Sequence, residues 1–176
     1  MSSTEVDTEI AAWLRGRIPD GWFLAPPEIT VDREELLIIG TVADVELEDG
    51  ASAPTPAARA AARSARTSRF REETRAPRMR IAEEAEHRFA KKVSWGTRIG
   101  DTTALYTTVS VPVMTRLRQP ERIVLDTLVD AGVARSRSDA LAWCVKLVGA
   151  NESEWIQGLR DALIHVEKVR SEGPTP

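Results

Sequence analysis

The sequence has little of the residues that build disulfide frameworks or metal sites. Its 176 residues include one cysteine, Cys144, and two histidines, His87 and His165. A single cysteine excludes an internal disulfide framework and is typical of a reducing compartment. The histidines fall on separate predicted helices, with no metal-ligand spacing to each other or to Cys144. We therefore expect no metal site, and we expect Cys144 to be a small buried hydrophobe beside Leu141 and Val148.

Sequence motifs of common enzyme classes are also missing. The chain contains no P-loop, G-x-G-x-x-G, G-x-S-x-G or H-E-x-x-H pattern. The acidic trio Glu83, Glu84 and Glu86 shares a predicted helix with basic residues, which is the pattern of solvent-exposed ion pairs. No residue is singled out as catalytic, so we expect neither an enzyme nor a cofactor.

Long apolar runs are absent as well. No stretch approaches the length of a membrane span, and the first residues lack a charged-then-apolar signal sequence. Apolar residues make up 42% of the chain and charged residues 29%, as in a soluble globular protein. We therefore expect a cytoplasmic protein with no membrane partner.

What the chain does have is a segregation of charge. Residues 1–56 hold 3 basic and 12 acidic side chains, whereas residues 57–122 hold 15 basic and 7 acidic ones. The net charge of the whole chain is only −3. Such segregation indicates a polyanionic partner, although the acidic part could equally neutralise the basic part within the fold or across a dimer.

Two segments predict a small α+β domain. Residues 1–49 predict an acidic helix followed by a β-hairpin around a polar turn at 32–34. Residues 77–112 predict a second helix and a hairpin around Gly100 and Asp101, which complete the domain. The run 36–39 is apolar on both faces and predicts a central strand.

Some residues of this domain are predicted to fill its core. Trp22 and Phe23, a pair of aromatic residues before the first strand, are expected to be core residues rather than a ligand platform. The helix after Pro77 is expected to bury Met79, Ala82, Ala85 and Phe89.

Residues 50–76 separate these two segments as a linker and a basic helix. The linker is rich in Gly, Ser, Ala and Pro, and Ala57–Arg75 then repeats arginine at helical spacing, at Arg59, Arg63 and Arg66. A helix of this composition buries little by itself. It is therefore predicted to be a solvated helix, an arm that orders on a polyanion, or a partner-binding segment.

The rest of the chain is organised around residues 113–150. Residues 113–118 alternate as a short strand, and a helical apolar stripe follows from Ile123 to Val129. Gly132 is expected to stop that helix. Ser136 and Asp139 then form a capping box at the start of a second helix. Residues 151–176 predict a C-terminal amphipathic helix and a frayed tail.

This order of strand, helix, glycine turn and Ser-capped helix resembles the ribbon-helix-helix family of the Arc/MetJ/CopG type. The resemblance implies a homodimer whose two strands pair into an antiparallel ribbon that enters the DNA major groove. It also implies that the start of the second helix holds a DNA phosphate. The residues that it places against DNA are Met114, Arg116, Arg118, Arg135, Ser136, Arg137 and Ser138.

Two predictions therefore stand side by side for residues 109–120. The first is the ribbon-helix-helix-like unit, whose function would be that of a bacterial DNA-binding transcription regulator. The second is a helical hairpin in which Ser110 caps a first helix and Pro120 kinks it. The alternative function is a non-catalytic adaptor that binds a protein or ribonucleoprotein partner, such as a ribosome or an RNA polymerase, through the α+β domain and the basic helix.

Overall fold

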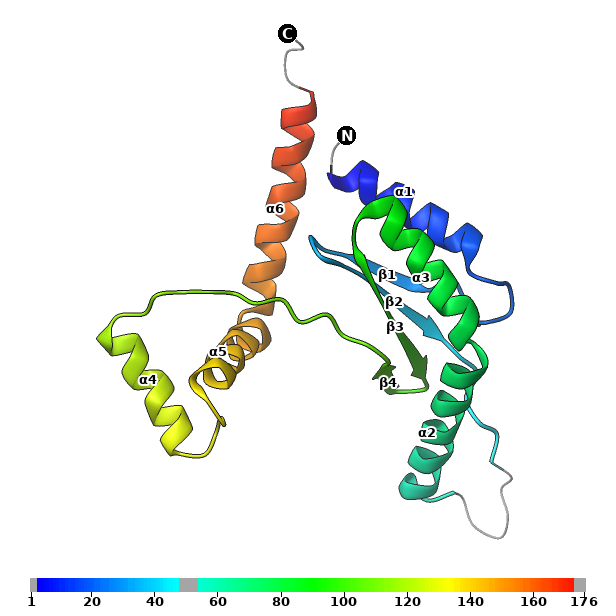
Figure 1. Ribbon diagram of the computed structural model, residues 1–176, viewed down its shortest axis with the longest axis horizontal. Coiled ribbons are helices and arrows are strands. Elements are labelled where there is room, and N and C mark those ends of the chain that lie inside the picture. The colour runs from blue at the N-terminus through cyan, green and yellow to red at the C-terminus, as the bar shows by residue number, and fades with distance from the viewer. Residues whose placement is uncertain (1–2, 48–53, 173–176) are drawn as a thin grey trace. The chain divides into compact units, whose positions relative to one another are not determined.

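The structure is a computed structural model that describes residues 3–47 and 54–172. It is an α+β fold, as predicted, and it divides into two compact units between Val111 and Pro112 (Figure 1). The first unit contains a four-stranded sheet with helices, and the second is helical. No helix among the described residues is long and apolar enough to cross a membrane.

The first unit follows the predicted order of helix, hairpin, helix and hairpin. Its helices are α1 (Ser3–Arg17), α2 (Pro56–Glu73) and α3 (Arg75–Phe89), and its strands are β1 (Glu28–Val31), β2 (Glu35–Thr41), β3 (Lys92–Ile99) and β4 (Thr102–Leu105). The sheet order is β1-β2-β3-β4. The two hairpins are antiparallel, and β2 pairs with β3 in parallel, with Leu36 opposite Val93. The strand predicted to be central is therefore paired on both sides.

The turns of both hairpins form as predicted. The Asp32 carboxylate accepts hydrogen bonds from the backbone N–H groups of Glu34 and Glu35 at 2.8 and 2.6 Å, which closes the first turn. Gly100 has a φ of 56° in the second turn, a conformation that glycine adopts without steric cost. These local interactions fix the register of each hairpin, and with it the face on which each side chain lies.

Helices α1 and α3 lie side by side and bury one face of the sheet (Figure 1). The core between them contains Ile10 and Leu14 of α1, Ala85 of α3, and Leu36 and Ile38 of β2. Trp22 and Phe23 pack against this core and against Phe70 of α2, so the prediction that they are core residues is confirmed.

Helix α2, the basic helix, is held to the same unit at two points. Phe70 is buried in a small cluster with Val42 and Ile99. Arg63 forms ion pairs with Asp44, at 2.6 Å, and with Asp101 in the β3–β4 turn. The hydrogen bond from Arg63 lowers the pKa of Asp44. The helix starts at Pro56, and the hydroxyl of Thr55 caps it by accepting from the Ala58 N–H.

One core prediction is wrong. Met79 was expected to face the core, but its side chain is 62% exposed, and the neighbouring Arg78 is buried in its place. Helix α3 follows α2 through Thr74. Arg78 is held on the buried side by hydrogen bonds to the Thr74 hydroxyl and the Arg71 carbonyl and by contacts with the Trp95 and Tyr106 rings. Ala82, Ala85 and the half-buried Phe89 pack as predicted.

Close packing at Gly40 provides a test of the first unit. A Cβ atom at Gly40 would overlap the ring of Phe23, whereas a Cβ at Gly16 on α1 would meet nothing within 4 Å. Gly40→Ala should therefore lower the free energy of unfolding by about 1–3 kcal/mol, because Phe23 must leave its place. Gly16→Ala, the control, should leave the free energy unchanged or raise it slightly. Urea denaturation measures both, and equal values for the two variants would contradict the packing of Phe23 on β2.

The second unit consists of an extended segment, residues 112–118, and three helices. These are α4 (Gln119–Asp130), α5 (Arg137–Asn151) and α6 (Ser153–Ser171). Residues 109–118 form neither a helix nor a strand, so the strand predicted at 113–118 is not present in the single chain. Pro120 lies in the first turn of α4, where proline is tolerated. The alternative helical hairpin, with a helix capped by Ser110 and kinked at Pro120, is therefore wrong.

Candidate nucleic-acid interface

The turn between α4 and α5 has the geometry that the glycine predicts. Gly132 has a φ of 73°, and its N–H donates to the Val129 carbonyl at 3.0 Å. The N–H of Val133 reaches back to the Leu128 carbonyl, also at 3.0 Å. These two hydrogen bonds define a Schellman motif, which ends α4 and turns the chain into α5.

Two side chains, Ser136 and Asp139, accept backbone hydrogen bonds at the start of α5. The Ser136 hydroxyl accepts from the Asp139 N–H at 3.2 Å, as the capping box predicts. The Asp139 carboxylate accepts from the backbone N–H of Arg135 at 3.0 Å, one residue before the position expected for a capping box. That hydrogen bond is the main cause of the lowered pKa of Asp139, and the Arg135 charge lowers it further. The loop 135–139 is therefore well defined before any ligand binds.

Arg137 is bound to α4 by a bidentate ion pair. Its Nε and Nη2 donate to the two carboxylate oxygens of Asp126 at 2.6 and 2.7 Å. The hydrogen bond from Arg137 lowers the pKa of Asp126, and the pKa of Arg137 is raised in return. A phosphate at the start of α5 would therefore have to share the Arg137 guanidinium with Asp126 or displace Asp126 from it. The sequence did not predict Asp126 as its partner, because they come close only after the Gly132 turn brings α4 and α5 together.

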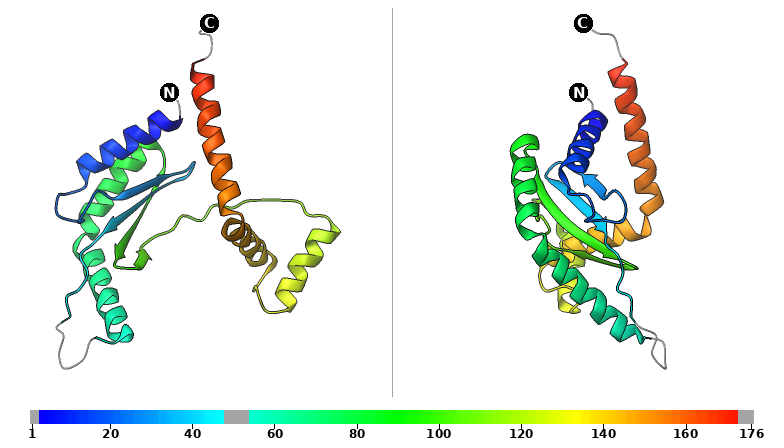
Figure 2. Two further views of the ribbon diagram at one scale, coloured as in Figure 1. Left: turned by 180° about the vertical axis from the view of Figure 1, so that it is seen from behind. Right: turned by 90° about the vertical axis from the view of Figure 1, so that its right-hand side faces the viewer.

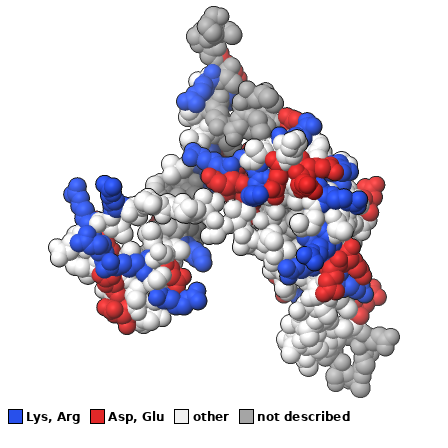
Figure 3. All heavy atoms as spheres, viewed as in Figure 1, with Lys and Arg blue, Asp and Glu red and all other residues white. Residues whose placement is uncertain are grey.

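The other predicted DNA-contact residues lie in solvent. Met114 is 97% exposed, and Arg116, Arg118 and Ser138 are exposed too. Leu117 instead packs against the small core of the second unit. Lys and Arg side chains project from this part of the chain into solvent (Figure 3). The structure thus places Ser136, Arg137 and Ser138 at the start of α5, and within the described residues the side chains of Met114, Arg116 and Arg118 form no hydrogen bond or ion pair.

The second unit buries little of its apolar surface. Its core contains Leu125, Ala134 and Ala140, with five partly buried neighbours that include Cys144. Helix α6 turns away from α4 and α5 beyond Glu152 (Figure 2). Large apolar side chains remain exposed on all three helices: Ile123 and Val124 on α4, Trp143, Val145, Leu147 and Val148 on α5, and Trp155, Leu159, Leu163, Ile164, Val166 and Val169 on α6.

A metal site finds no support in the described residues, where no group of three or more His, Cys, Asp or Glu side chains converges. Glu84 and Glu86 form surface ion pairs, but their partners lie outside α3 and not at the i,i+4 spacing on the same helix that the sequence predicts. Glu84 pairs with Arg17, and Glu86 pairs with Lys92 at 2.6 Å. Both pairs are exposed and serve the packing of the first unit.

Comparison with known proteins assigns the chain to a family. Residues 8–105 match the model of the Rv1265-like protein N-terminal domain, and residues 118–170 match the model of the Mb1296 C-terminal domain. The chain is 55% identical over 164 residues to the Mb1296 protein of Mycobacterium bovis and to the Rv1265 protein of Mycobacterium tuberculosis. Each alignment covers 93% of this chain and 70% of the relative.

No solved structure matches the chain. Neither matching family model is a ribbon-helix-helix model, so that resemblance stays a prediction. The two matched segments fall in the first and second units, respectively. On the length and identity of these matches, the chain belongs to the Rv1265-like protein family.

Proposed function

We propose that the chain is a homodimeric, DNA-binding regulator of the cytoplasm, in which residues 113–118 of two copies pair into an antiparallel ribbon that binds the DNA major groove. The observation that carries this proposal is the order of an unpaired segment, helix α4, the turn at Gly132 and helix α5. Residue Arg118 has extended backbone angles, φ −82° and ψ 177°, immediately before α4 begins.

The unpaired backbone of this segment supports a partner strand. An extended segment presents a row of N–H and C=O groups that pair readily with another strand. Within the part of the chain that the structure describes, residues 112–118 pair with no strand. A second copy of the same segment would supply the missing hydrogen bonds in an antiparallel ribbon.

The exposed apolar residues of α4 and α5 support the same dimer. Val124 is 54% exposed and Val145 66% exposed, although both lie on helices that pack against each other. A unit whose described residues bury a core cluster of Leu125, Ala134 and Ala140 is expected to be marginal alone. Burying these faces against a second copy would stabilise the fold and place two equivalent strands side by side.

The charge of the proposed ribbon supports DNA as the ligand. Arg116 and Arg118 alternate with Leu117, so that their side chains can share one face while Leu117 packs on the helices. Among the described residues, neither arginine takes part in an ion pair. A pair of free guanidinium groups on a two-stranded ribbon suits hydrogen bonding to guanine edges and phosphates.

Pairing of the segment is tested by sedimentation equilibrium at micromolar concentration. The wild-type protein should have about twice the mass of one chain, and Thr115→Pro should be largely monomeric, because proline removes a ladder hydrogen bond from the strand centre. Thr108→Pro, a change in the extended segment before the ribbon, should remain dimeric. A monomeric wild-type protein would exclude the ribbon and favour the adaptor alternative.

A further inference from the structure

Among the described residues, the buried arginine of the first unit has no carboxylate partner of the kind that such a charge normally has. The side chain of Arg78 is only 7% exposed. Its Nε donates to the Thr74 hydroxyl at 2.9 Å, and its Nη2 donates to the Arg71 carbonyl at 2.7 Å. Both acceptors are neutral. Buried charges in proteins are usually paired with an opposite charge, because removing a lone ion from water is costly.

Two aromatic rings, those of Trp95 and Tyr106, partly compensate for the missing counter-charge. The guanidinium carbon of Arg78 lies 4.7 Å from the centre of the Tyr106 ring and 6.0 Å from that of Trp95. Tyr106 is fixed in turn by a 3.0 Å hydrogen bond between its hydroxyl and that of Thr97. Cation–π contacts favour the charge without neutralising it. Burial lowers the pKa of Arg78 despite these rings, as expected for a cation with no anion beside it.

Two further arginines gather at the same place. Arg71 lies over the same Tyr106 ring, at 5.7 Å from its centre, and the charges of Arg71 and Arg75 both act on Arg78. The three arginines follow one another at helical spacing across the junction of α2 and α3. In the described part of the chain none of them forms an ion pair, unlike Arg63 and Arg69 on α2. These like charges repel one another, and an anion bound between them would offset that repulsion.

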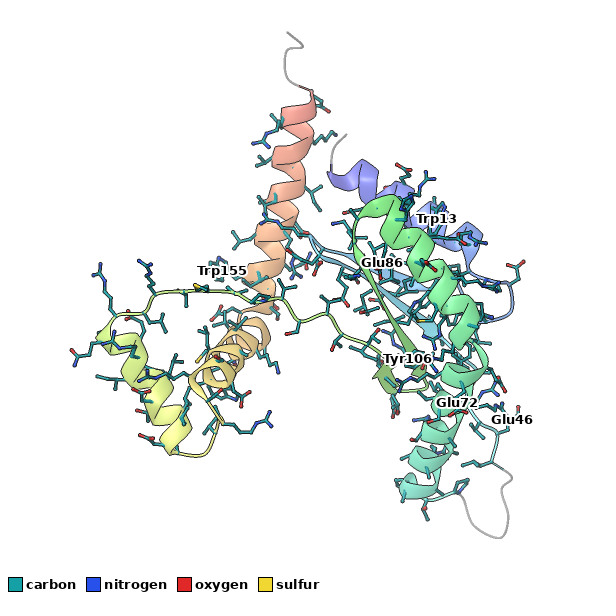
Figure 4. The ribbon with its side chains drawn as sticks, viewed as in Figure 1. Trp13, Glu46, Glu72, Glu86, Tyr106 and Trp155 are labelled. Carbon is teal, nitrogen blue, oxygen red and sulfur yellow. The ribbon has the colours of Figure 1, made fainter. Side chains whose placement is uncertain are left out.

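The surface beside these residues is hollowed. A shallow depression of about 390 Å³ is lined by Ser68, Arg71, Glu72 and Arg75. Tyr106 lies just beyond β4, close to the junction of α2 and α3, and Glu72 lies on the last turns of α2 (Figure 4). The single carboxylate of Glu72 leaves an excess of positive charge at this place. The guanidinium groups of Arg71 and Arg75 and the hydroxyl of Ser68 line an open depression, and such donors can bind an oxyanion.

We propose that Arg71 and Arg75 bind a phosphate group in this depression, next to the buried Arg78, whose guanidinium contacts the same Tyr106 ring as that of Arg71. The phosphate accepts hydrogen bonds from Arg71 and Arg75 at the surface and neutralises the charge of Arg78 beneath them. The phosphate belongs either to a free phosphate ion or to the backbone of a nucleic acid, since both present the same tetrahedral oxyanion. The site lies in the first unit and does not depend on the ribbon proposed for the second.

The test compares two double variants of the full chain. Arg71→Gln/Arg75→Gln removes the two exposed arginines of the site and leaves the buried Arg78 in place. Arg59→Gln/Arg80→Gln removes the same charge from exposed positions of α2 and α3 outside the site. The thermal midpoint is followed as inorganic phosphate replaces chloride at constant ionic strength, and the affinity for a random-sequence duplex is measured by fluorescence anisotropy.

For a free phosphate ion, phosphate should raise the midpoint of the wild type and of the control variant, and the site variant should bind it roughly tenfold more weakly. For a nucleic-acid backbone, phosphate should leave all midpoints unchanged, and the duplex affinity of the site variant alone should fall by a similar factor. Equal behaviour of the site and control variants in both measurements would overturn the proposal. Arg116→Ala should not alter the phosphate response, so this site and the ribbon can fail separately.

Discussion

Arg116→Ala should weaken binding to a preferred DNA duplex by about 1–3 kcal/mol and binding to a random duplex by much less. The expected loss is large because a ribbon arginine that reads a base edge makes a bidentate, charge-assisted hydrogen bond, and the dimer makes it twice. Arg116 is exposed and forms no ion pair within the described chain, so its removal should leave folding and dimerisation intact. Fluorescence anisotropy over a salt series, with enriched and random duplexes, measures both affinities.

The control for this prediction is Arg160→Ala, which removes an exposed arginine from α6, outside the proposed ribbon. It should lower the affinity for both duplexes slightly and alike, as the loss of a distant charge does. Identical affinities of the wild type and Arg116→Ala on every duplex tested would mean that residues 113–118 do not read DNA. Binding to a protein or ribonucleoprotein would then become the better proposal.

Among single substitutions in the second unit, Leu125→Ala should cause the largest loss of stability. Leu125 is 6% exposed and is the largest side chain of the buried cluster that it forms with Ala134 and Ala140. Truncation should lower the free energy of unfolding by about 2–3 kcal/mol, the lower part of the range for leucine, because so small a core can partly close around the cavity. The loss should appear in urea denaturation and should abolish DNA binding through loss of the α4–α5 arrangement.

Val124→Ala, on the adjacent position of α4, separates burial within one chain from burial in the dimer. Val124 is 54% exposed in the single chain, so its truncation should matter little if the protein is a monomer. In the proposed dimer it should lower stability in a concentration-dependent way, because dimer stability depends on chain concentration. Equal, concentration-independent losses for Leu125→Ala and Val124→Ala would contradict the arrangement of α4 and α5 described here.

Local sequence signals predicted most of the first unit. Alternation and turn residues identified both hairpins, since Asp32 and Gly100 form the turns through contacts within a few residues. The parallel pairing of β2 with β3 was not predicted, because it joins residues more than fifty positions apart. Hairpin patterns say nothing about which edges of two hairpins meet.

The wrong prediction for Met79 shows a second limit of what the sequence alone reveals. Apolar periodicity favours Met79 as the core residue, but Arg78 is buried instead, with its guanidinium hydrogen-bonded to Thr74 and in contact with the Tyr106 and Trp95 rings. A buried arginine that contacts the rings of Trp95 in β3 and Tyr106 after β4 has no local sequence signature. The phosphate site proposed at this place could therefore be recognised only from the structure.

For the second unit, the sequence predicted the glycine turn and the Ser136 cap, and both form. The bidentate pair between Arg137 and Asp126 was missed, because eleven positions separate the two residues. The strand predicted at 113–118 does not form in the single chain, and the ribbon remains a proposal that needs a second copy.

Amide hydrogen exchange of residues 113–118 tests the proposed ribbon most directly. In an antiparallel ribbon, alternate N–H groups of this segment donate to the partner strand and are protected from exchange. We predict slow exchange in this segment at micromolar concentration and faster exchange when dilution dissociates the dimer. Rapid exchange of residues 113–118 at every concentration, with α4 and α5 still protected, would contradict the ribbon.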